Sequence, residues 1–285
     1  MVKEELLNLI FDKSARIIDK LHGGMMNESL VVSCNNKKYV LYIPTAQANE
    51  MVDRVFEKEN VDIISSLGVT SKNIYFNTQT GVKANEFIEG HSLNYVDEID
   101  HKKIASLLTK LHQSKTLASK NYNPFERING FIEEREALTK VTSPFYDELY
   151  NFVLSYKDFL LDDTLVLCHN DFQRSNIIKD LNDNYFMIDF EFAANNYALY
   201  DVACFGNDNV NDGVLLLKEY KNGSPSLLDY KRFYLWRIFI SLQWYNVALI
   251  KHYRGEGDAH KINFLKVSEH FLSNAKEAFS LFHKS

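Results

Sequence analysis

The stretch LCHNDFQRSNIIKDLNDNYFMIDFEF, from Leu167 to Phe192, is the part of this sequence that decides its interpretation. Its pattern predicts two short apolar strands around a polar loop, and we expect that loop to place Asp171, Asn176 and Asp189 together. An Asp followed five residues later by an Asn, and then a hydrophobic strand that ends in a second Asp, is the layout of a phosphoryl-transfer site. In such a site one carboxylate orients an acceptor hydroxyl, while an amide oxygen and another carboxylate hold Mg²⁺ against nucleotide phosphates. This layout predicts a small-molecule kinase.

Each member of this set also has a less specific interpretation. A lone Asp in a loop usually forms a turn, so the prediction that Asp171 is the catalytic base depends on the pattern around it. Asn176 is alternatively a strand cap. Asp189 directly follows the apolar run Tyr185–Ile188, and a charge beside a buried strand is costly unless a partner such as a metal ion neutralises it. Glu191 faces the same side if the chain stays extended, so we expect a direct or indirect metal contact there.

Two residues near this stretch have structural and functional alternatives. His169 precedes the loop, and we favour a histidine that ties the loop to its neighbours over a nucleophile. A hydrolase that uses His169 and Asp171 would also need a nucleophile elbow of the Gly-x-Ser-x-Gly type, which the sequence lacks. Asp201, in LYDVACF, either caps a helix or hydrogen-bonds the catalytic loop, and we favour the capping role.

Composition narrows the class of protein. A chain of 285 residues with 46% hydrophobic and 25% charged residues is an ordinary globular protein. The net charge of −6 argues against nucleic-acid binding, but not against ATP, because Mg²⁺ offsets the phosphate charge. The three cysteines, Cys34, Cys168 and Cys204, match no metal motif, so we expect buried free thiols. The pattern shows no signal peptide and no membrane span, so we expect a cytoplasmic protein. We expect this protein to be a monomer or a homodimer.

Hydrophobic periodicity predicts an α+β chain with two lobes. The small lobe, residues 1–88, is predicted to hold a helix over 3–19, strands Leu30–Ser33 and Tyr39–Ile43 around a turn at 35–38, a helix over 48–67 stopped by Gly68, and strands Ile74–Asn77 and Val82–Phe87 turned at Thr80-Gly81. The larger lobe, residues 89–285, is predicted to be mostly helical, with helices at Ile99–His112, Asn129–Leu138, Phe145–Leu160, Ser226–Lys251 and 259–283. A short connector near Glu86–Gly90 joins them, and ligands favour the cleft between such lobes.

The small lobe adds two candidates for nucleotide binding. The run from His22 to Asn27 contains the pair Gly23-Gly24 just before a strand, and paired glycines allow close backbone approach to phosphates. Glu57 lies on the next predicted helix, where a kinase places the acid that pairs with a phosphate-binding base.

The sequence resembles a known family at these points. HNDFQRSN (His169–Asn176), followed by MIDFEFAANNYALYDVACF (Met187–Phe205), resembles the choline/ethanolamine kinase family of the aminoglycoside-phosphotransferase superfamily. LHGGMMNESL, VDRVFEKEN, GVKANEFIEG and YNPFERI are similar to further segments of the bacterial choline kinases, so the resemblance covers most of the chain. It implies a two-lobe, protein-kinase-like fold: a small N-terminal lobe with an antiparallel sheet plus a helix, and a larger, mostly helical C-terminal lobe. It also implies ATP and Mg²⁺ as cofactors, and a small amine or alcohol as acceptor.

The same resemblance implies roles for individual residues. The catalytic set is Asp171, Asn176 and Asp189. The metal set is Asn176, Asp189 and Glu191. The nucleotide set is Gly24, Asn27, Arg54, Glu57, Glu86, Phe87 and Ile88, with the chain from Glu86 to Glu89 meeting adenine through its backbone. The acceptor set is Asp171, Gln173, Glu191, Tyr197 and Trp244, in which aromatic faces hold the ammonium group.

Two departures from the family pattern keep alternatives open. Relatives carry an Arg or Lys at the position of Tyr42, so either Arg54 or a nearby lysine compensates, or the chain is a catalytically weakened, nucleotide-binding pseudokinase. Relatives also carry a helix with two tryptophans three apart, and here Trp244 is followed by Val247. The resemblance makes choline the first candidate acceptor. The missing second tryptophan keeps ethanolamine, thiamine and an aminoglycoside as alternatives.

Overall fold

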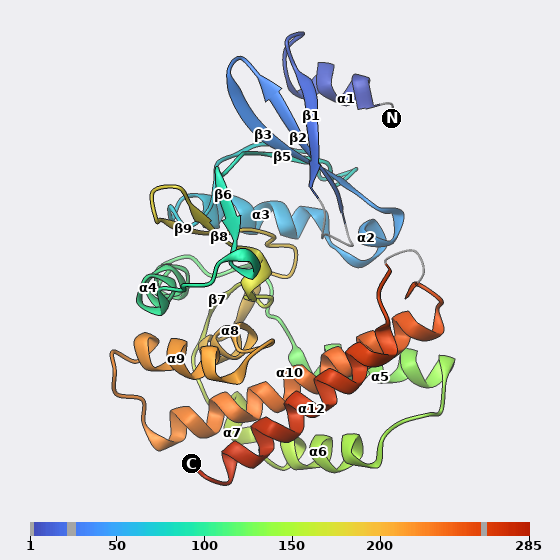
Figure 1. Cartoon of the computed structure of the whole chain (residues 1–285), viewed down its shortest axis with the longest axis vertical. Coiled ribbons are helices and arrows are strands. Elements are labelled where there is room, and N and C mark those ends of the chain that lie inside the picture. The colour runs from blue at the N-terminus through green and yellow to red at the C-terminus, as the bar shows by residue number, and fades with distance from the viewer. Residues whose placement is uncertain (1–2, 22–26, 258–260) are drawn as a thin grey trace. The chain divides into compact units, whose positions relative to one another are not determined.

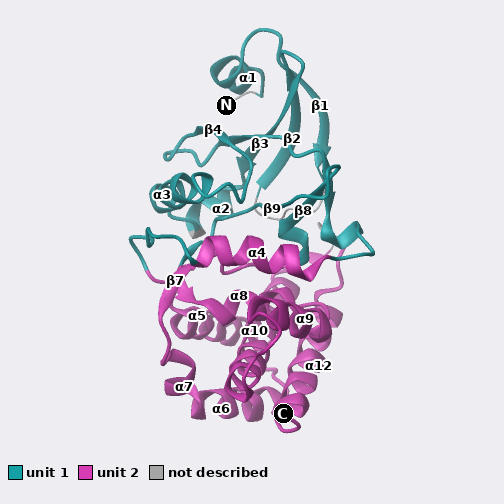
Figure 2. Cartoon of the chain, turned by 90° about the vertical axis from the view of Figure 1, so that its left-hand side faces the viewer, with its two compact units in different colours: residues 1–99, 113–120, 174–194 teal, residues 100–112, 121–173, 195–285 magenta. Residues whose placement is uncertain are grey.

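The computed structural model describes residues 3–21, 27–257 and 261–285, except for the side chains of Gln47 and Met51. These residues form two compact units (Figure 2). Unit 1 takes in the residues up to 99 together with 113–120 and 174–194, and unit 2 takes in 100–112, 121–173 and 195–285. The lobe boundary predicted between residues 88 and 89 stays a prediction.

Unit 1 is built on antiparallel strands (Figure 1). Its helices are α1 (Lys3–Ile10), α2 (Ala46–Met51) and α3 (Arg54–Ser65), with 3-10 turns η1 (Leu93–Tyr95) and η2 (Arg174–Asn176). Its strands are β1 (Arg16–Leu21), β2 (Asn27–Cys34), β3 (Lys37–Pro44), β4 (Asn73–Phe76), β5 (Lys83–Glu86), β6 (Gly90–Ser92), β8 (Ile177–Asp180) and β9 (Tyr185–Met187). The first five strands form one sheet in the order β1-β2-β3-β5-β4, and the others form a second sheet in the order β6-β8-β9.

The β2–β3 hairpin confirms the strands predicted there. Asn35 and Asn36 form the two-residue turn with φ of 51° and 60°, a left-handed pair that asparagine tolerates and that matches the twist of the strands. Apolar residues on the inner face of the sheet, among them Leu30, Val32 and Leu41, pack against Leu6 of α1 and form the core of this sheet. The alternation of the sequence decides which face is buried.

Two of the helices predicted in unit 1 are wrong in extent. The helix expected over 3–19 ends at Ile10, and β1 follows it, because Arg16–Leu21 pairs with β2 and so satisfies its backbone in a sheet. The helix expected over 48–67 is two helices, because Asp53 caps a new one by accepting the backbone N–H groups of Val55 and Phe56, both at 3.1 Å. Gly68 does stop the second helix, with φ of 66°.

Gly90 allows a close approach between β6 and β8. Gly90 pairs with Asp180 at the start of β6, and a Cβ atom placed on it would lie 2.2 Å from the carbonyl oxygen of Lys179. Only glycine lets β6 approach β8 this closely. The segment after residue 86 is therefore held against the hairpin that carries Asn176 and Asp189.

Unit 2 is mostly helical. Its helices are α4 (His101–His112), α5 (Pro124–Leu138), α6 (Pro144–Ser155), α7 (Lys157–Leu161), α8 (Ala198–Phe205), α9 (Val210–Tyr220), α10 (Leu227–Tyr253) and α12 (Phe264–Phe282). The pair β7 (Leu165–Cys168) and β10 (Ala194–Tyr197) forms a small two-stranded sheet. The α+β class, with an antiparallel sheet first and helices after it, is confirmed, whereas α9 was not predicted.

Helix α10 forms the centre of unit 2. It packs along α12, beside which it runs in Figure 1, and also against α5 and α8. Its buried Arg237 donates to the carbonyl oxygen of Ala203 at 3.0 Å and to Ser241 Oγ at 2.9 Å, and burial lowers the pKa of Arg237 to about 10. Between Phe233 and Ile250 almost every residue of this helix is buried, so its middle is surrounded by other elements rather than amphipathic.

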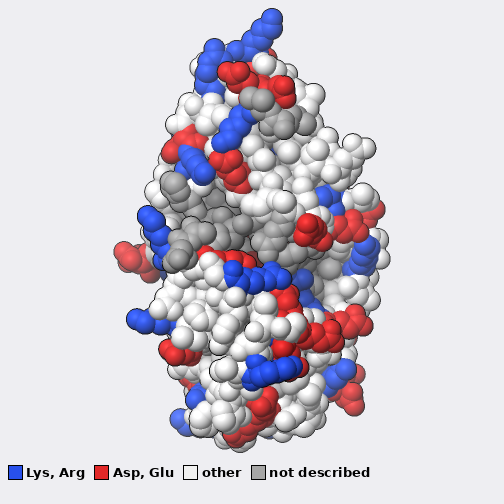
Figure 3. All heavy atoms as spheres, turned by 90° about the vertical axis from the view of Figure 1, so that its right-hand side faces the viewer, with Lys and Arg blue, Asp and Glu red and all other residues white. Residues whose placement is uncertain are grey.

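The surface charges are mixed in sign and the cysteines are buried, as is usual for a globular protein. On the face drawn in Figure 3, basic and acidic side chains are interspersed rather than gathered into a single-sign patch. All three cysteines are free and buried, which confirms that prediction. Within the described part of the chain, none of the helices combines the length and the apolar character that crossing a membrane requires.

Candidate active site

The loop of residues 169–173 follows β7 and is held by Asp201 of α8. The buried carboxylate of Asp201 accepts the backbone N–H of His169 at 2.7 Å and that of Asn170 at 2.8 Å. Asn170 takes φ of 65°, and its side-chain oxygen accepts from Asn196 Nδ2 at 2.7 Å. Asp201 lies inside its helix rather than at the N-cap, so the role favoured from the sequence was wrong, and the alternative, a hydrogen bond to the loop, is what the structure has.

Asp171 lies half-buried in this loop. Its Oδ2 accepts from Gln173 Nε2 at 3.2 Å, so two predicted acceptor-site residues lie in contact. Its backbone N–H donates to Nδ1 of the fully buried His169 at 3.3 Å, as expected of a structural histidine. The loop therefore presents a carboxylate whose backbone is fixed on one side by His169 and, through the neighbouring residues, by Asp201.

Asn176 and Asp189 are brought together by the β8–β9 hairpin of unit 1. The strands pair as Ile177 with Met187, and just beyond that pair the N–H of Ile188 donates to the carbonyl oxygen of Asn176 at 2.9 Å. Asp189 follows with φ of 67°, a left-handed conformation that turns the chain sharply out of the strand. Asn176 and Asp189 are thirteen residues apart in the sequence, but they lie close together at one end of this hairpin.

Glu191 completes an oxygen-rich set beside Asp189. Its Oε2 is buried and has no hydrogen-bond partner among the described residues. Burial first, and then the charge of Asp189, raise the pKa of Glu191 to about 8. An amide oxygen and two carboxylates are the donors that Mg²⁺ prefers, and a buried carboxylate oxygen without a partner fits a cation ligand.

The nucleotide set contains a buried ion-pair network around Glu57 of α3. Its Oε2 lies 2.6 Å from Arg54 Nη1, and its Oε1 lies 2.6 Å from Nζ of Lys83 on β5. All three side chains are almost completely buried. Arg54 also donates from Nε to Asn49 Oδ1 at 3.0 Å. Sequence analysis named Arg54 and Glu57 but missed Lys83, and the available signal was a lysine inside the apolar strand run Val82–Phe87.

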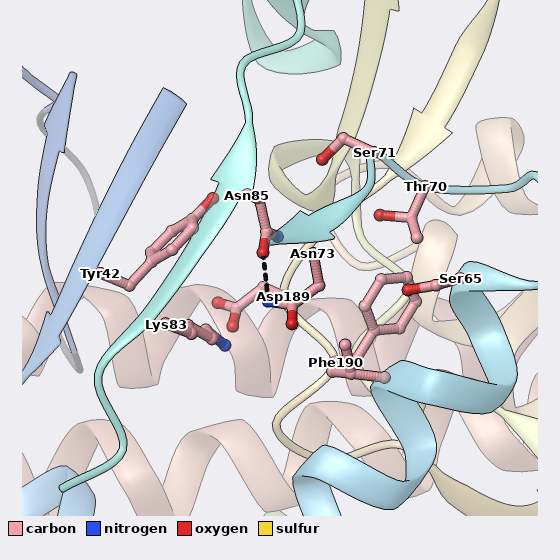
Figure 4. Close-up of a pocket in the computed structure, with 10 residues that line it drawn as sticks. Tyr42, Ser65, Thr70, Ser71, Asn73, Lys83, Asn85, Asp189 and Phe190 are labelled. Carbon is pink, nitrogen blue, oxygen red and sulfur yellow. Dashed lines mark hydrogen bonds between the residues drawn. The ribbon is translucent and has the colours of Figure 1, made fainter. Parts of the chain in front are cut away.

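A pocket in unit 1 lies beside this network (Figure 4). Tyr42 enters it from β3, Lys83 from β5, and Asp189 from the segment after β9. Asn73 Nδ2 donates to Asn85 Oδ1 at 2.8 Å across its far wall. A cationic group and an anionic group therefore face one recess.

The remaining nucleotide residues are placed as follows. Asn27 begins β2, and its Oδ1 is buried with no partner among the residues described. Gly24 lies outside the described residues. The backbone N–H of Glu86 donates to Lys72, and that of Phe87 donates to Lys38, so these two donors are already occupied. The adenine contact predicted for Glu86, Phe87 and Ile88 stays a prediction.

The aromatic residues of the predicted acceptor set lie apart in unit 2. Tyr197, half-buried before α8, stacks on the buried Trp236 at 6.0 Å between ring centroids, and Trp236 meets Tyr200 edge-on at 5.2 Å. Trp244 instead stacks on Phe271 of α12 at 6.1 Å. The ring that backs Tyr197 is thus Trp236, and the role predicted for Trp244 stays a prediction.

One further group of metal-type ligands lies at the base of the loop of residues 169–173, which Asp201 holds. The ligand atoms of His112, Cys168 and Asp201 all lie within 4.8 Å of one another, and all three residues are buried. The Asp201 oxygens already accept backbone N–H groups, and burial raises the pKa of Cys168 well above its usual range. Both oxygens of Asp201 are thus engaged in holding the loop backbone, so this cluster anchors the loop.

Comparison with known proteins identifies the family. The sequence model of the choline/ethanolamine kinases matches residues 18–213, which is more than half of the chain. This chain belongs to the choline/ethanolamine kinase family. The family assignment made from the sequence is thereby confirmed, and the protein is a phosphotransferase that acts on an alcohol group.

Other members of this kinase family are distant in sequence but similar in fold. The protein LicA of Haemophilus influenzae is 22% identical over 250 residues, which cover 82% of this chain and 73% of that protein. A choline/ethanolamine kinase family protein from Mesorhizobium loti has a TM-score of 0.77 with 18% identity, covering 98% of this chain and 95% of that one. Choline kinase LicA from Streptococcus pneumoniae has a TM-score of 0.75 with 22% identity, covering 99% and 98%. These structures confirm the protein-kinase-like fold.

Proposed function

We propose that this kinase transfers the γ-phosphoryl group of ATP to the hydroxyl of a small amino alcohol, with choline as the first candidate. The observation that carries the proposal is the half-site in unit 1, where Asn176, Asp189 and Glu191 lie on one hairpin and the segment after it, beside the Glu57–Lys83 ion pair. Oxygen donors next to a buried cation suit a magnesium–phosphate complex. A solved structure of LicA holds AMP, which supports a nucleotide at this fold.

The proposed role of Asp171 is to accept or orient the proton of the acceptor hydroxyl. A carboxylate that orients a nucleophile must hold its direction, and Asp201 fixes the backbone of the two residues before Asp171 through bonds of 2.7 and 2.8 Å. Gln173 donates to Oδ2 of the Asp171 carboxylate at 3.2 Å, which restricts its rotation. Positioning and charge stabilisation account for most of phosphoryl-transfer catalysis, so this rigidity supports the assignment.

The proposed metal ligands are the oxygens of Asn176, Asp189 and Glu191. When bound there, Mg²⁺ neutralises charge on the phosphates. A metal ion held there would favour the ionised form of Glu191, whose pKa is raised to about 8 by burial and by the charge of Asp189. The buried, unpartnered oxygen of Glu191 in the described structure supports this ligand set.

Choline as the acceptor has support from both the relatives and the ring geometry. LicA from Streptococcus pneumoniae is a choline kinase. Tyr197 offers a half-buried ring whose other side is backed by Trp236, and a desolvated quaternary ammonium over such a face gains about 2 kcal/mol. The cytoplasmic location and the oligomeric state expected from the sequence stay predictions.

The test is a substrate panel with purified protein, Mg²⁺ and ATP. We expect turnover with choline above that with ethanolamine, thiamine and kanamycin, and a loss of at least about 100-fold in kcat for Asp171→Asn, because a positioned base contributes about 10²–10⁴-fold. Asp180→Asn is the control, since Asp180 accepts backbone N–H groups of its own turn. Nucleotide binding without product from any acceptor would instead favour the pseudokinase, and a preference for another acceptor would replace choline.

A further inference from the structure

Tyr42 gives the nucleotide pocket no positive charge. Its ring lines the pocket from β3, and burial and then the charge of Asp189 raise its pKa to about 12 even though Lys83 opposes that shift. The phenol is therefore neutral at physiological pH. A nucleotide triphosphate carries several negative charges, so a cation must come from another element.

Sheet register places that cation opposite Tyr42. In the antiparallel β3–β5 pair, Tyr42 faces Lys83, and directly paired residues project on the same side of a sheet. Lys83 Nζ lies 5.3 Å from the centre of the Tyr42 ring, so the aromatic face covers the ammonium group. The β5 lysine thus reaches the recess that a base on β3 would reach (Figure 4).

The surroundings keep Lys83 charged. Burial by itself would lower its pKa, but the charges of Glu57, Asp189 and Glu191 outweigh burial, and the net shift is upward. Glu57 in turn is held by Arg54 through its second oxygen, which fixes the direction of the first. Arg54 does not line the pocket among the residues described, whereas Lys83 does.

The stability of the fold does not by itself explain the buried ion pair of Lys83 and Glu57. Replacing a buried pair by apolar residues of similar volume is often neutral or stabilising, because the desolvation of two charges offsets their attraction. Here the exposed fraction is 6% for the Lys83 side chain and 0% for Glu57. Because a buried pair is weak evidence for stability, its position beside the pocket favours a functional role.

We propose that Lys83 on β5 is the phosphate-binding cation of this kinase, in the place left neutral by Tyr42, and that Glu57 is its positioning residue. The assignment rests on the proposed function. The ammonium binds the nucleotide phosphates, and the Glu57–Arg54 pair keeps it aimed into the pocket beside Asp189. The chain then needs no cation on β3.

The test compares Lys83→Met, which keeps the stem and removes the charge, with the relocation variant Tyr42→Lys/Lys83→Met. For Lys83→Met we expect Kd for Mg·ATP to rise about 30-fold or more, since a charged hydrogen bond to phosphate is lost, and Kd for adenosine to change less than about two-fold. The relocation variant should regain most of the ATP affinity, because its new lysine enters the same recess. Lys37→Ala, at the exposed start of β3, is the lysine control and should bind as the wild type does.

Several results overturn the assignment. One is ATP affinity within about two-fold of wild type in Lys83→Met. A second is an equal loss of affinity for ATP and for adenosine in Lys83→Met, which indicates a structural role. A third is a relocation variant that melts at the same temperature as the wild type but binds ATP no better than Lys83→Met. If Lys83→Met does not fold, Lys83→Gln, which removes the charge but keeps a donor for Glu57, is measured in its place. Wild-type protein that neither binds ATP nor forms product refutes the proposed function itself, whereas an active wild type with an unaffected Lys83→Met refutes this assignment alone.

Discussion

The anchoring of the catalytic loop by Asp201 makes a quantitative prediction for the variants Asp201→Ala and Asp201→Asn. In the structure the buried Asp201 carboxylate accepts three bonds, from the backbone N–H groups of His169 and Asn170 at 2.7 and 2.8 Å and from His112 Nε2 at 3.1 Å. The alanine variant leaves all three donors without an acceptor. The asparagine variant keeps one side-chain oxygen and turns an amide NH₂ group toward the remaining donors.

The expected costs follow from these contacts. Each buried donor without an acceptor costs about 1–3 kcal/mol, and the alanine variant leaves three such donors. We therefore expect Asp201→Ala to lower the free energy of unfolding by about 4 kcal/mol, and Asp201→Asn by about 2 kcal/mol. Because the loop that carries Asp171 loses its anchor, kcat should fall in the same order, while the KM for ATP should change little.

The measurements are urea unfolding followed by circular dichroism and steady-state kinetics in choline and ATP. Asp180→Asn is the matched control, because Asp180 also accepts two backbone N–H groups, from Asn182 at 2.8 Å and from Asn184 at 2.7 Å, but in a turn open to water. Water replaces the lost acceptor there, so the control should cost at most about 0.5 kcal/mol. Equal costs for the Asp180 and Asp201 variants, or an asparagine variant no more stable and no more active than the alanine variant, would refute the reasoning.

Two further predictions concern the stability of glycine variants and its dependence on pH. Gly90→Ala should lower the free energy of unfolding by about 1–3 kcal/mol, because the new Cβ atom would lie 2.2 Å from the Lys179 carbonyl oxygen. In contrast Gly130→Ala, which meets no atom within 4 Å, should stabilise α5 by about 0.5–1 kcal/mol, and thermal melts that rank the two the other way contradict this. In Mg²⁺-free buffer the pKa of Glu191 near 8 keeps its carboxyl protonated in the folded chain but ionised in the unfolded chain above about pH 4.5, so the stability of the wild type should fall as pH rises through that window. Glu191→Gln should remove that fall, and at pH 8 its free energy of unfolding should exceed that of the wild type by at most about 5 kcal/mol. If the variant is stabilised equally at pH 5 and pH 8, the titration of Glu191 is not the cause.

Local patterns account for the features that the sequence predicted correctly. The β2–β3 hairpin depends on two adjacent asparagines that accept positive φ, and the proximity of Asn176 and Asp189 depends on a short hairpin that returns the chain to Asn176. That these two residues hold a metal stays a prediction. Both relations are settled by neighbours within about a dozen residues, so alternation and turn residues were enough to find them. The helix stop at Gly68 is of the same kind.

The wrong predictions share a different cause. The segment Arg16–Leu21 has an amphipathic pattern but pairs with β2, and pairing with a partner strand overrides helical periodicity. Asp201 resembled an N-cap because its donors, His169 and Asn170, lie more than thirty residues earlier in the chain. Local propensity carries no information about such distant partners.

The sequence by itself determined the family, the α+β class and the short motif that holds Asp171, Asn176 and Asp189, because each depends on residues close together in the chain. Only the tertiary structure placed Lys83 in the pocket and against Glu57. Lys83 lies 26 residues from Glu57, and the two meet because β5 inserts between β3 and β4 in the sheet while α3 packs beside it. Strand order and helix packing set that contact, and the periodicity of the sequence encodes neither of them.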